Sequence, residues 1–238
     1  MRYARLILKP SIIAIDGPAG SGKSTLAHLL AKRLGYVYFD TGVMYRAVSL
    51  AALERGVSID DEVGLSELAE TIRIDVDAPS VDDSRLYTVL LDGVDVTWHI
   101  RTSAVDAIVS PVSAVPGVRR ALLEQQRRVG RRGHVIMVGR DIGTVVFPDA
   151  DRKLFVDASL EARAQRRHEE LLQRGERVTY EHVLDEMRRR DERDRSKPIS
   201  PLVPAPDAIV LDTTALEIEA MVDKAEAILA RGSQVAVP

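Results

Sequence analysis

The stretch GPAGSGKST at residues 17–25 has the residue types and spacing of a loop that holds phosphate. It satisfies the pattern G-x-x-x-x-G-K-[ST], in which the glycines let backbone N–H groups converge on an anion at a helix N-terminus. Lys23 adds a charge that reaches the outer phosphates, and the Ser24 hydroxyl can coordinate magnesium. We therefore expect a nucleoside triphosphate site formed by Gly17, Pro18, Ala19, Gly20, Ser21, Gly22, Lys23, Ser24 and Thr25, with Ser24 as the Mg²⁺ ligand.

The segments on either side of this loop have the pattern needed to position it. Residues 11–16 form a short apolar run typical of a buried strand, and residues 23–35 have helical periodicity that ends at a glycine. A glycine-rich turn that matches by chance would not be framed in this way. The phosphate-binding interpretation is therefore favoured, although it does not identify the phosphoryl acceptor.

The rest of the chain predicts a doubly wound α/β fold. Apolar strands alternate with helices, which indicates a five-stranded parallel sheet with ligands beyond the carboxyl ends of the strands. Residues 73–97 differ, because β-branched runs flank an Asp-Gly turn and predict a small antiparallel insertion. The further strands are expected at 36–40, 134–141, 153–159 and 208–214, and helices at 41–56, 64–73, 114–130 and 215–232, with two Arg-rich helices between the last two strands.

Composition excludes several classes of chemistry. The 238 residues include no cysteine, which removes disulfides, thiolate nucleophiles and cysteine metal sites. The net charge is −3, and Lys9 and Pro10 interrupt the first apolar stretch before a signal or membrane segment could form. We expect a cytoplasmic, monomeric protein of one domain (1–238) that binds neither membrane nor nucleic acid.

Arginine is concentrated in one part of the chain. Residues 119–197 hold 20 Lys and Arg against 15 Asp and Glu, and nearly all of these basic residues are arginine. The guanidinium group matches phosphate oxygens in geometry, so the bias favours phosphate recognition. An arginine-rich genome is the alternative, and composition alone does not separate the two.

Several polar residues come directly after predicted strands or at helix starts. Thr41 and Arg46 open one helix, Arg140 and Asp141 follow a strand, and Arg119 begins another helix. Arg46 as a surface residue and Asp141 as a helix cap are reasonable structural alternatives. Their joint placement at one edge of the sheet favours a shared pocket.

The segment MRRRDERDRSKP at residues 187–198 packs arginines among carboxylates. For Arg188 and Arg189 we favour a solvated helix with i, i+3 and i, i+4 pairs. The other basic residues favour a mobile, phosphate-facing segment, because phosphoryl transfer depends on charge neutralisation.

The chain resembles bacterial cytidylate kinases. The resemblance runs from about residue 11 to residue 230 and rests on five motifs in the order and spacing of that family, IDGPAGSGKST, DTGVMYR, GRDIGTVVFPDA, LFVDAS and RRDERDRSKPISPLVPAPDAIVLDTT. It implies a P-loop kinase fold with a nucleoside-monophosphate-binding insertion (41–118) and a lid (160–196). It also implies transfer of the γ-phosphoryl group of ATP to CMP or dCMP, with Mg²⁺ as cofactor.

The resemblance assigns roles residue by residue. Thr41 stands near the acceptor, and Arg46, Arg140 and Lys197 hold its phosphate, although Lys197 replaces the arginine usual there. Cytosine is read by Ser110, Arg119 and Asp141, and the sugar is contacted by Arg190 and Asp194. Lys23, Arg140 and Arg190 are the expected catalytic residues, and Arg163, Arg166 and Arg167 the expected lid contacts to ATP.

Three rival functions remain at this point. A regulatory GTPase needs an N-K-x-D element, which a chain without asparagine cannot contain. A nucleic-acid-binding protein is weakened by the acidic residues within the Arg-rich helices. A kinase for UMP or shikimate differs only in the residues that read the acceptor.

Overall fold

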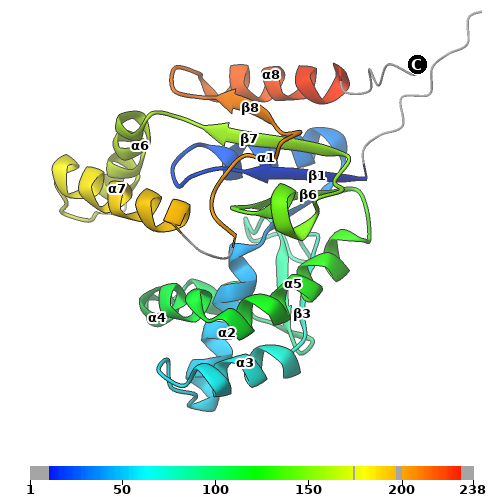
Figure 1. Cartoon of the computed structure of the whole chain (residues 1–238), viewed down its shortest axis with the longest axis vertical. Helices are drawn as coiled ribbons and strands as arrows, with labels where there is room; N and C mark the ends of the chain where they lie inside the picture. The colour runs from blue at the N-terminus through cyan, green and yellow to red at the C-terminus, as the bar shows by residue number, and fades with distance from the viewer. Residues whose placement is uncertain (1–10, 174, 197–199, 232–238) are drawn as a thin grey trace, which may run out of the picture.

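The main sheet consists of five parallel strands in the order β2-β6-β1-β7-β8. The structure is a computed structural model that describes residues 11–173, 175–196 and 200–231 (Figure 1). Because the strands are apolar along their length and the central ones are buried on both faces, the sheet forms the middle layer of the fold. The strands are β1 (Ile12–Asp16), β2 (Val37–Asp40), β6 (Val135–Gly139), β7 (Arg152–Asp157) and β8 (Ile209–Asp212).

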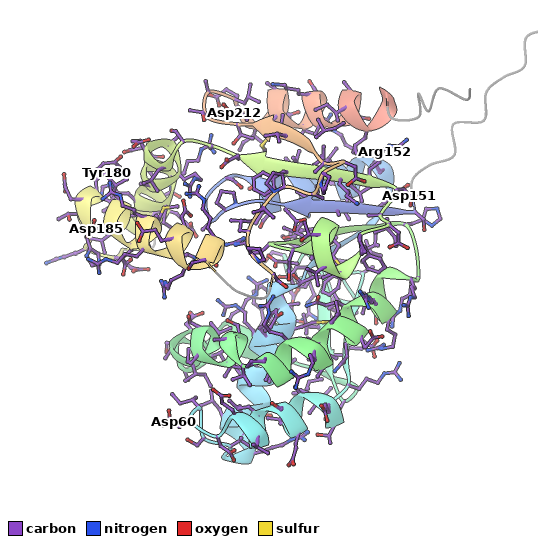
Figure 2. The ribbon with its side chains drawn as sticks, viewed as in Figure 1. Asp60, Asp151, Arg152, Tyr180, Asp185 and Asp212 are labelled. Atoms are coloured by element: carbon purple, nitrogen blue, oxygen red, sulfur yellow. The ribbon has the colours of Figure 1, made fainter. Side chains whose placement is uncertain are left out.

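The two ends of this sheet have different surroundings. Asp212 marks the carboxyl end and lies on the side of α6 (Leu160–Gln173) and α7 (Tyr180–Ser196), whereas Asp151 and Arg152 lie at the opposite, amino end (Figure 2). The candidate functional residues are expected beyond the carboxyl ends of the strands, which is the end of the sheet that Asp212 marks.

Helix α1 (Lys23–Leu34) follows the phosphate-loop motif as the sequence predicts. Its N-cap Gly22 and C-cap Gly35 both have left-handed backbone conformations, with φ of 83° and 72°. Its apolar stripe is buried, and α1 packs against β6 and against α8 (Ile218–Arg231). The fold thus presents the N-terminus of α1 at the carboxyl end of β1.

The chain between β2 and β6 forms a second group of elements, which lies below the main sheet in Figure 1, on the side of β6. It contains a three-stranded antiparallel sheet whose Asp92-Gly93 turn has positive φ at both residues, as predicted from that dipeptide. One continuous apolar core joins this group to the main sheet. Its elements are α2 (Gly42–Arg55), α3 (Glu62–Thr71), β3 (Ile74–Asp77), β4 (Thr88–Leu91), β5 (Val94–Asp95), a 3₁₀ turn (His99–Arg101), α4 (Ser103–Ala114) and α5 (Pro116–Gly130).

Two elements were not predicted. Helix α4 contains Pro111, which has no N–H to donate to the carbonyl of Ala107, so the helix forms with one intrahelical hydrogen bond fewer. The residues after β6, to which the sequence assigned no element beyond a possible helix cap at Asp141, form one π-helical turn, Ile142–Val146. Each of these two elements carries or adjoins a residue that is expected to bind the acceptor.

Helices α6 and α7 pack on each other around a small core of their own, formed by Ala164, Leu171, Val183 and Met187. This cluster is separate from the main core, and Ala19 of the phosphate loop packs against it. Within the described ranges, no helix has the length and apolar character required to cross a bilayer.

Candidate active site

The phosphate loop has a backbone that only glycine can follow at its first position. Gly17 has φ of 153°, and a Cβ there would lie 2.0 Å from the carbonyl oxygen of Val156. Lys23 is buried beneath the loop, and its Nζ donates to the Pro18 carbonyl at 2.8 Å. Burial lowers the pKa of Lys23 well below its usual value, and the charge of Arg140 lowers it further. The ammonium group is therefore short of anionic partners, which is the state expected of a phosphate-binding lysine.

Hydroxyl groups complete the phosphate loop. The Ser21 Oγ is buried and has no hydrogen-bond partner among the described residues. Ser24 shares a hydrogen bond with the hydroxyl of Tyr38, whose pKa is raised by burial. The Asp40 carboxylate lies close enough to offset part of the shift of Lys23.

Arg119 on α5 and Asp141 after β6 form an ion pair, although 22 residues separate them in the sequence. The Arg119 Nη2 donates to the Asp141 Oδ2 at 2.9 Å, and both side chains are mostly shielded, with 18% and 14% exposed. The Nε of Arg119 is buried without a partner. The arrangement offers an unused donor beside a carboxylate, and Tyr45 lies under the guanidinium at 5.8 Å.

Arg140 links three segments of the chain. Its Nε donates to the Asp194 Oδ2 on α7 at 3.0 Å, and its Nη1 donates to the Gly17 carbonyl at 3.0 Å. Arg190 lies within the electrostatic field of Arg140. Arg190 keeps exposed surface, yet its pKa is lowered, first by desolvation and then by Arg140. An arginine whose pKa is lowered by burial and by a neighbouring arginine marks a place where an anion would be stabilised.

Arg46 is engaged by the chain itself. Its Nη1 donates to the Ile100 carbonyl at 3.0 Å and pairs with the Asp106 Oδ1 at 2.6 Å. The Thr41 hydroxyl is buried and donates to the Val138 carbonyl at 3.0 Å, which joins the ends of β2 and β6. Ser110 is exposed on α4.

The three lid arginines differ in their surroundings. Arg163 is 2% exposed, with bonds to the carbonyls of Ala158 (2.9 Å) and Ala19 (3.2 Å) and a two-bond pair with Asp191 at 3.1 and 2.6 Å. Every nitrogen of its guanidinium is thus engaged by protein in this structure, and a contact of Arg163 with ATP stays a prediction. In this structure Arg163 joins α6 to α7 and to the phosphate loop.

Arg166 and Arg167 are less enclosed. Arg166 donates to the carbonyl oxygen of Thr213 at 2.6 Å and to its hydroxyl at 3.2 Å, while Arg167 pairs with Glu170 on the surface of α6. Both therefore stay predictions as ATP contacts. Lys197 falls outside the described residues.

Sequence reasoning assigned no role to three carboxylates. They are Asp16, Asp106 and Asp191. Asp191 had a signal, because it lies on the helix face of Val183 and Met187, which is the buried face of α7.

The comparisons with known proteins agree with this geometry. A family model described as cytidylate kinase matches residues 13–231. The cytidylate kinase of Herpetosiphon aurantiacus is 50% identical over 204 residues, 86% of this chain and 87% of that protein. The cytidylate kinase of Carboxydothermus hydrogenoformans is 49% identical over 223 residues, 94% and 99% of the two chains.

A solved structure shows the same fold at much lower identity. The shikimate kinase of Bacteroides thetaiotaomicron aligns with a TM-score of 0.50 and 12% identity, covering 92% of this chain and 98% of its own. The match to the family model over most of the chain, and the identity of about half to the curated relatives, show that this chain belongs to the cytidylate kinase family.

Proposed function

We propose that this chain transfers the γ-phosphoryl group of ATP to CMP or dCMP, with CDP or dCDP as product. The observation that carries the proposal is the shielded pair of Arg119 and Asp141, because Asp141 directly follows Arg140, whose Nη1 donates to the Gly17 carbonyl of the phosphate loop. Asp141, which would bind the base, and Arg140, which would bind the phosphate, are thus adjacent in the sequence.

Cytosine and uracil present opposite edges to this pair. Cytosine has an exocyclic amine that donates and a ring N3 that accepts, so it matches the Asp141 carboxylate and the unused Nε of Arg119. Uracil reverses both roles and would leave shielded groups mispaired. Sites built on such bonds can discriminate by about 10⁴-fold.

The remaining acceptor residues are assigned by charge and position. Arg46 and Arg140 would supply cationic forks for the acceptor phosphate, and Lys197 would add a charge without a fork. Thr41 and Ser110 are further proposed contacts to the acceptor. Asp194, paired with Arg140, would reach the sugar together with Arg190.

The residues present fit a magnesium ion that arrives with ATP. The Ser24 hydroxyl and the Asp40 carboxylate are hard oxygen donors near the phosphate loop, and Mg²⁺ is usually held by few protein ligands plus substrate phosphates. In keeping with that, the described residues contain no cluster of three or more His, Cys, Asp or Glu suited to a metal. When bound, the ion would offset phosphate charge during in-line transfer.

Two parts of the chain would then close on the substrates. Residues 41–118 would bind the nucleoside monophosphate, and residues 160–196 would act as the lid, because α6 and α7 have a core separate from the main one. Closure brings Arg190 toward the transferring group and excludes water, which would limit hydrolysis of ATP.

The direct test is a coupled assay of ADP release with ATP and Mg²⁺. CMP, dCMP, UMP, AMP and shikimate are supplied in turn beside an acceptor-free blank. We expect turnover with CMP and dCMP, and a value of kcat/KM for UMP lower by about 10²-fold or more. Comparable turnover with UMP would refute the base-reading assignment and favour the alternative acceptor.

The variant Asp141→Asn extends this test. Its amide can no longer act as acceptor on both sides, so we expect kcat/KM for CMP to fall far more than that for UMP. Arg188→Met is the matched control, because Arg188 pairs with Asp185 on the outer side of α7, where Figure 2 shows Asp185.

A further inference from the structure

Asp16 is a buried carboxylate that holds the backbone immediately after the proposed acceptor residues. It is the last residue of β1 and is 5% exposed. Its Oδ1 accepts from the backbone N–H of Ile142 at 2.8 Å, and its Oδ2 accepts from that of Gly143 at 2.7 Å. Both carboxylate oxygens are thus committed to a segment more than 120 residues away in sequence.

The same residue also aligns the start of that segment. In the sheet, Asp16 is the register partner of Gly139, the last residue of β6. Only Arg140 and Asp141 lie between Gly139 and the two residues bound by the Asp16 side chain. Asp16 therefore fixes this two-residue segment at both ends, once through the sheet and once through its carboxylate.

The arrangement leaves Asp141 available for its proposed role. Asp141 occupies the N-cap of the π-helix Ile142–Val146, where a carboxylate commonly accepts from the first N–H groups, yet its side chain makes no capping bond. Its Oδ2 instead accepts from Arg119. Asp16 satisfies the N–H groups that Asp141 would otherwise have to cap.

The connection continues into the phosphate loop. Gly17, which follows Asp16, offers its carbonyl to the Nη1 of Arg140 at 3.0 Å. Burial raises the pKa of Asp16 to about 6, although the two backbone hydrogen bonds act in the opposite direction. The chain thus has a carboxylate at a position where an apolar side chain would be easier to bury.

We propose that Asp16 is a positioning residue for acceptor recognition, which sets the orientation of Arg140 and Asp141 relative to the phosphate loop. The proposal rests on the proposed function, because it concerns the reading of the acceptor base. It assigns no contact between Asp16 and substrate.

The test is Asp16→Asn in the full chain. Asparagine keeps one oxygen acceptor but turns an N–H₂ group toward one of the two N–H groups, so the segment loses one of its bonds. We expect KM for CMP to rise by about tenfold or more and the CMP-to-UMP ratio of kcat/KM to fall by a similar factor. KM for ATP should change by less than about twofold, because Lys23 and the loop glycines are untouched.

The control is Val135→Ala, a core truncation at the opposite end of β6, where Val135 pairs with Ile12. It lowers stability without touching the segment and should leave both KM for CMP and the CMP-to-UMP ratio unchanged. If Asp16→Asn does not fold, Gly143→Ala carries the test, since its Cβ would lie 3.1 Å from the Lys153 Cδ and 3.4 Å from the Asp16 Oδ2 and so crowd the carboxylate that binds this segment.

The outcomes separate the proposal from its premise. If the native chain does not phosphorylate CMP, the proposed function fails. If it does, but Asp16→Asn resembles Val135→Ala in lowering only the melting temperature, or raises both KM values equally, Asp16 is merely structural and the positioning role is overturned.

Discussion

The arginines on the two sides of the site are held in different ways. On the acceptor side, Arg46 and Arg119 pair with Asp106 and Asp141 at 2.6 and 2.9 Å, and these side chains keep part of their surface exposed. On the donor side, Arg163 forms a fully buried pair with Asp191. The partners are carboxylates in all three cases, but the solvent exposure differs.

This difference determines which pairs a substrate can exchange. A partly exposed ion pair contributes about 0–1 kcal/mol, so a dianionic phosphate can replace the carboxylate at low cost. Removal of one partner from a buried pair costs about 3–5 kcal/mol. The acceptor side is thus suited to bind ligands, and the Arg163 pair is suited to hold the lid helices on the phosphate loop.

The largest expected effect belongs to Arg140, which joins the acceptor side to the phosphate loop. Replacement by methionine removes a guanidinium beside the transferring group, and we expect kcat to fall by about 10³-fold. Steady-state rates of Arg140→Met with ATP and CMP measure this, with Arg188→Met as the control. A loss below tenfold would mean that Arg140 is a structural link only.

The next effect concerns the buried pair. Arg163→Met should lower the free energy of unfolding by about 3–5 kcal/mol, because Asp191 would be left charged without its partner. The double variant Arg163→Met/Asp191→Leu should recover part of this loss. Urea denaturation of both variants and of the native chain gives the comparison.

Kinetics of the same variant can contradict the assignment. If Arg163→Met keeps its stability while KM for ATP rises tenfold, Arg163 contacts the nucleotide after all. Arg166→Met should behave in the opposite way. Arg166 donates mainly to Thr213, so its replacement should change KM for ATP more than the free energy of unfolding.

Only some of these features could be predicted from the sequence. The phosphate loop, the five parallel strands and the antiparallel insertion were predicted, because each depends on local patterns of glycine and apolar residues. Arg163, Arg166 and Arg167 were treated alike, because they lie on one Arg-rich helix with few apolar residues. Their different environments come from α7, and the carboxylate of Asp191 decides which arginine is buried.

Two further features depended on tertiary contacts. The π-helix Ile142–Val146 has no sequence pattern of its own and is stabilised from outside by Asp16. Helix α4 has a proline near its end and packs against α2, so its formation follows from burial rather than from helix propensity.

The third prediction concerns pH and the residue between the two sides. Because burial raises the pKa of Asp16 from 3.8 to about 6, the folded state binds the proton more tightly than the unfolded state between these values. Stability from this group therefore falls as pH rises through that window, by about 3 kcal/mol at 1.36 kcal/mol per pH unit.

The measurement is the difference in unfolding free energy between the native chain and Asp16→Asn at pH 4 and pH 7.5. The difference should shift in favour of the variant at the higher pH, because the amide of the variant does not ionise. Lys23 and Asp141 are present in both proteins, so the comparison isolates the effect of residue 16. A difference that is constant with pH would show that Asp16 titrates normally.

The smallest expected effect tests whether the acceptor-side pairs are exchangeable. In the ligand-free chain Asp106 occupies the Arg46 guanidinium that the acceptor phosphate would take. Asp106→Ala removes this internal competitor, and since an exposed pair contributes at most about 1 kcal/mol, KM for CMP should fall by up to about fivefold. Asp92→Ala, which breaks the Arg55 pair on the insertion, should leave KM unchanged. A rise in KM for Asp106→Ala would mean that the carboxylate orients Arg46 for the phosphate, so that the two sides of the site would differ less than their exposure indicates.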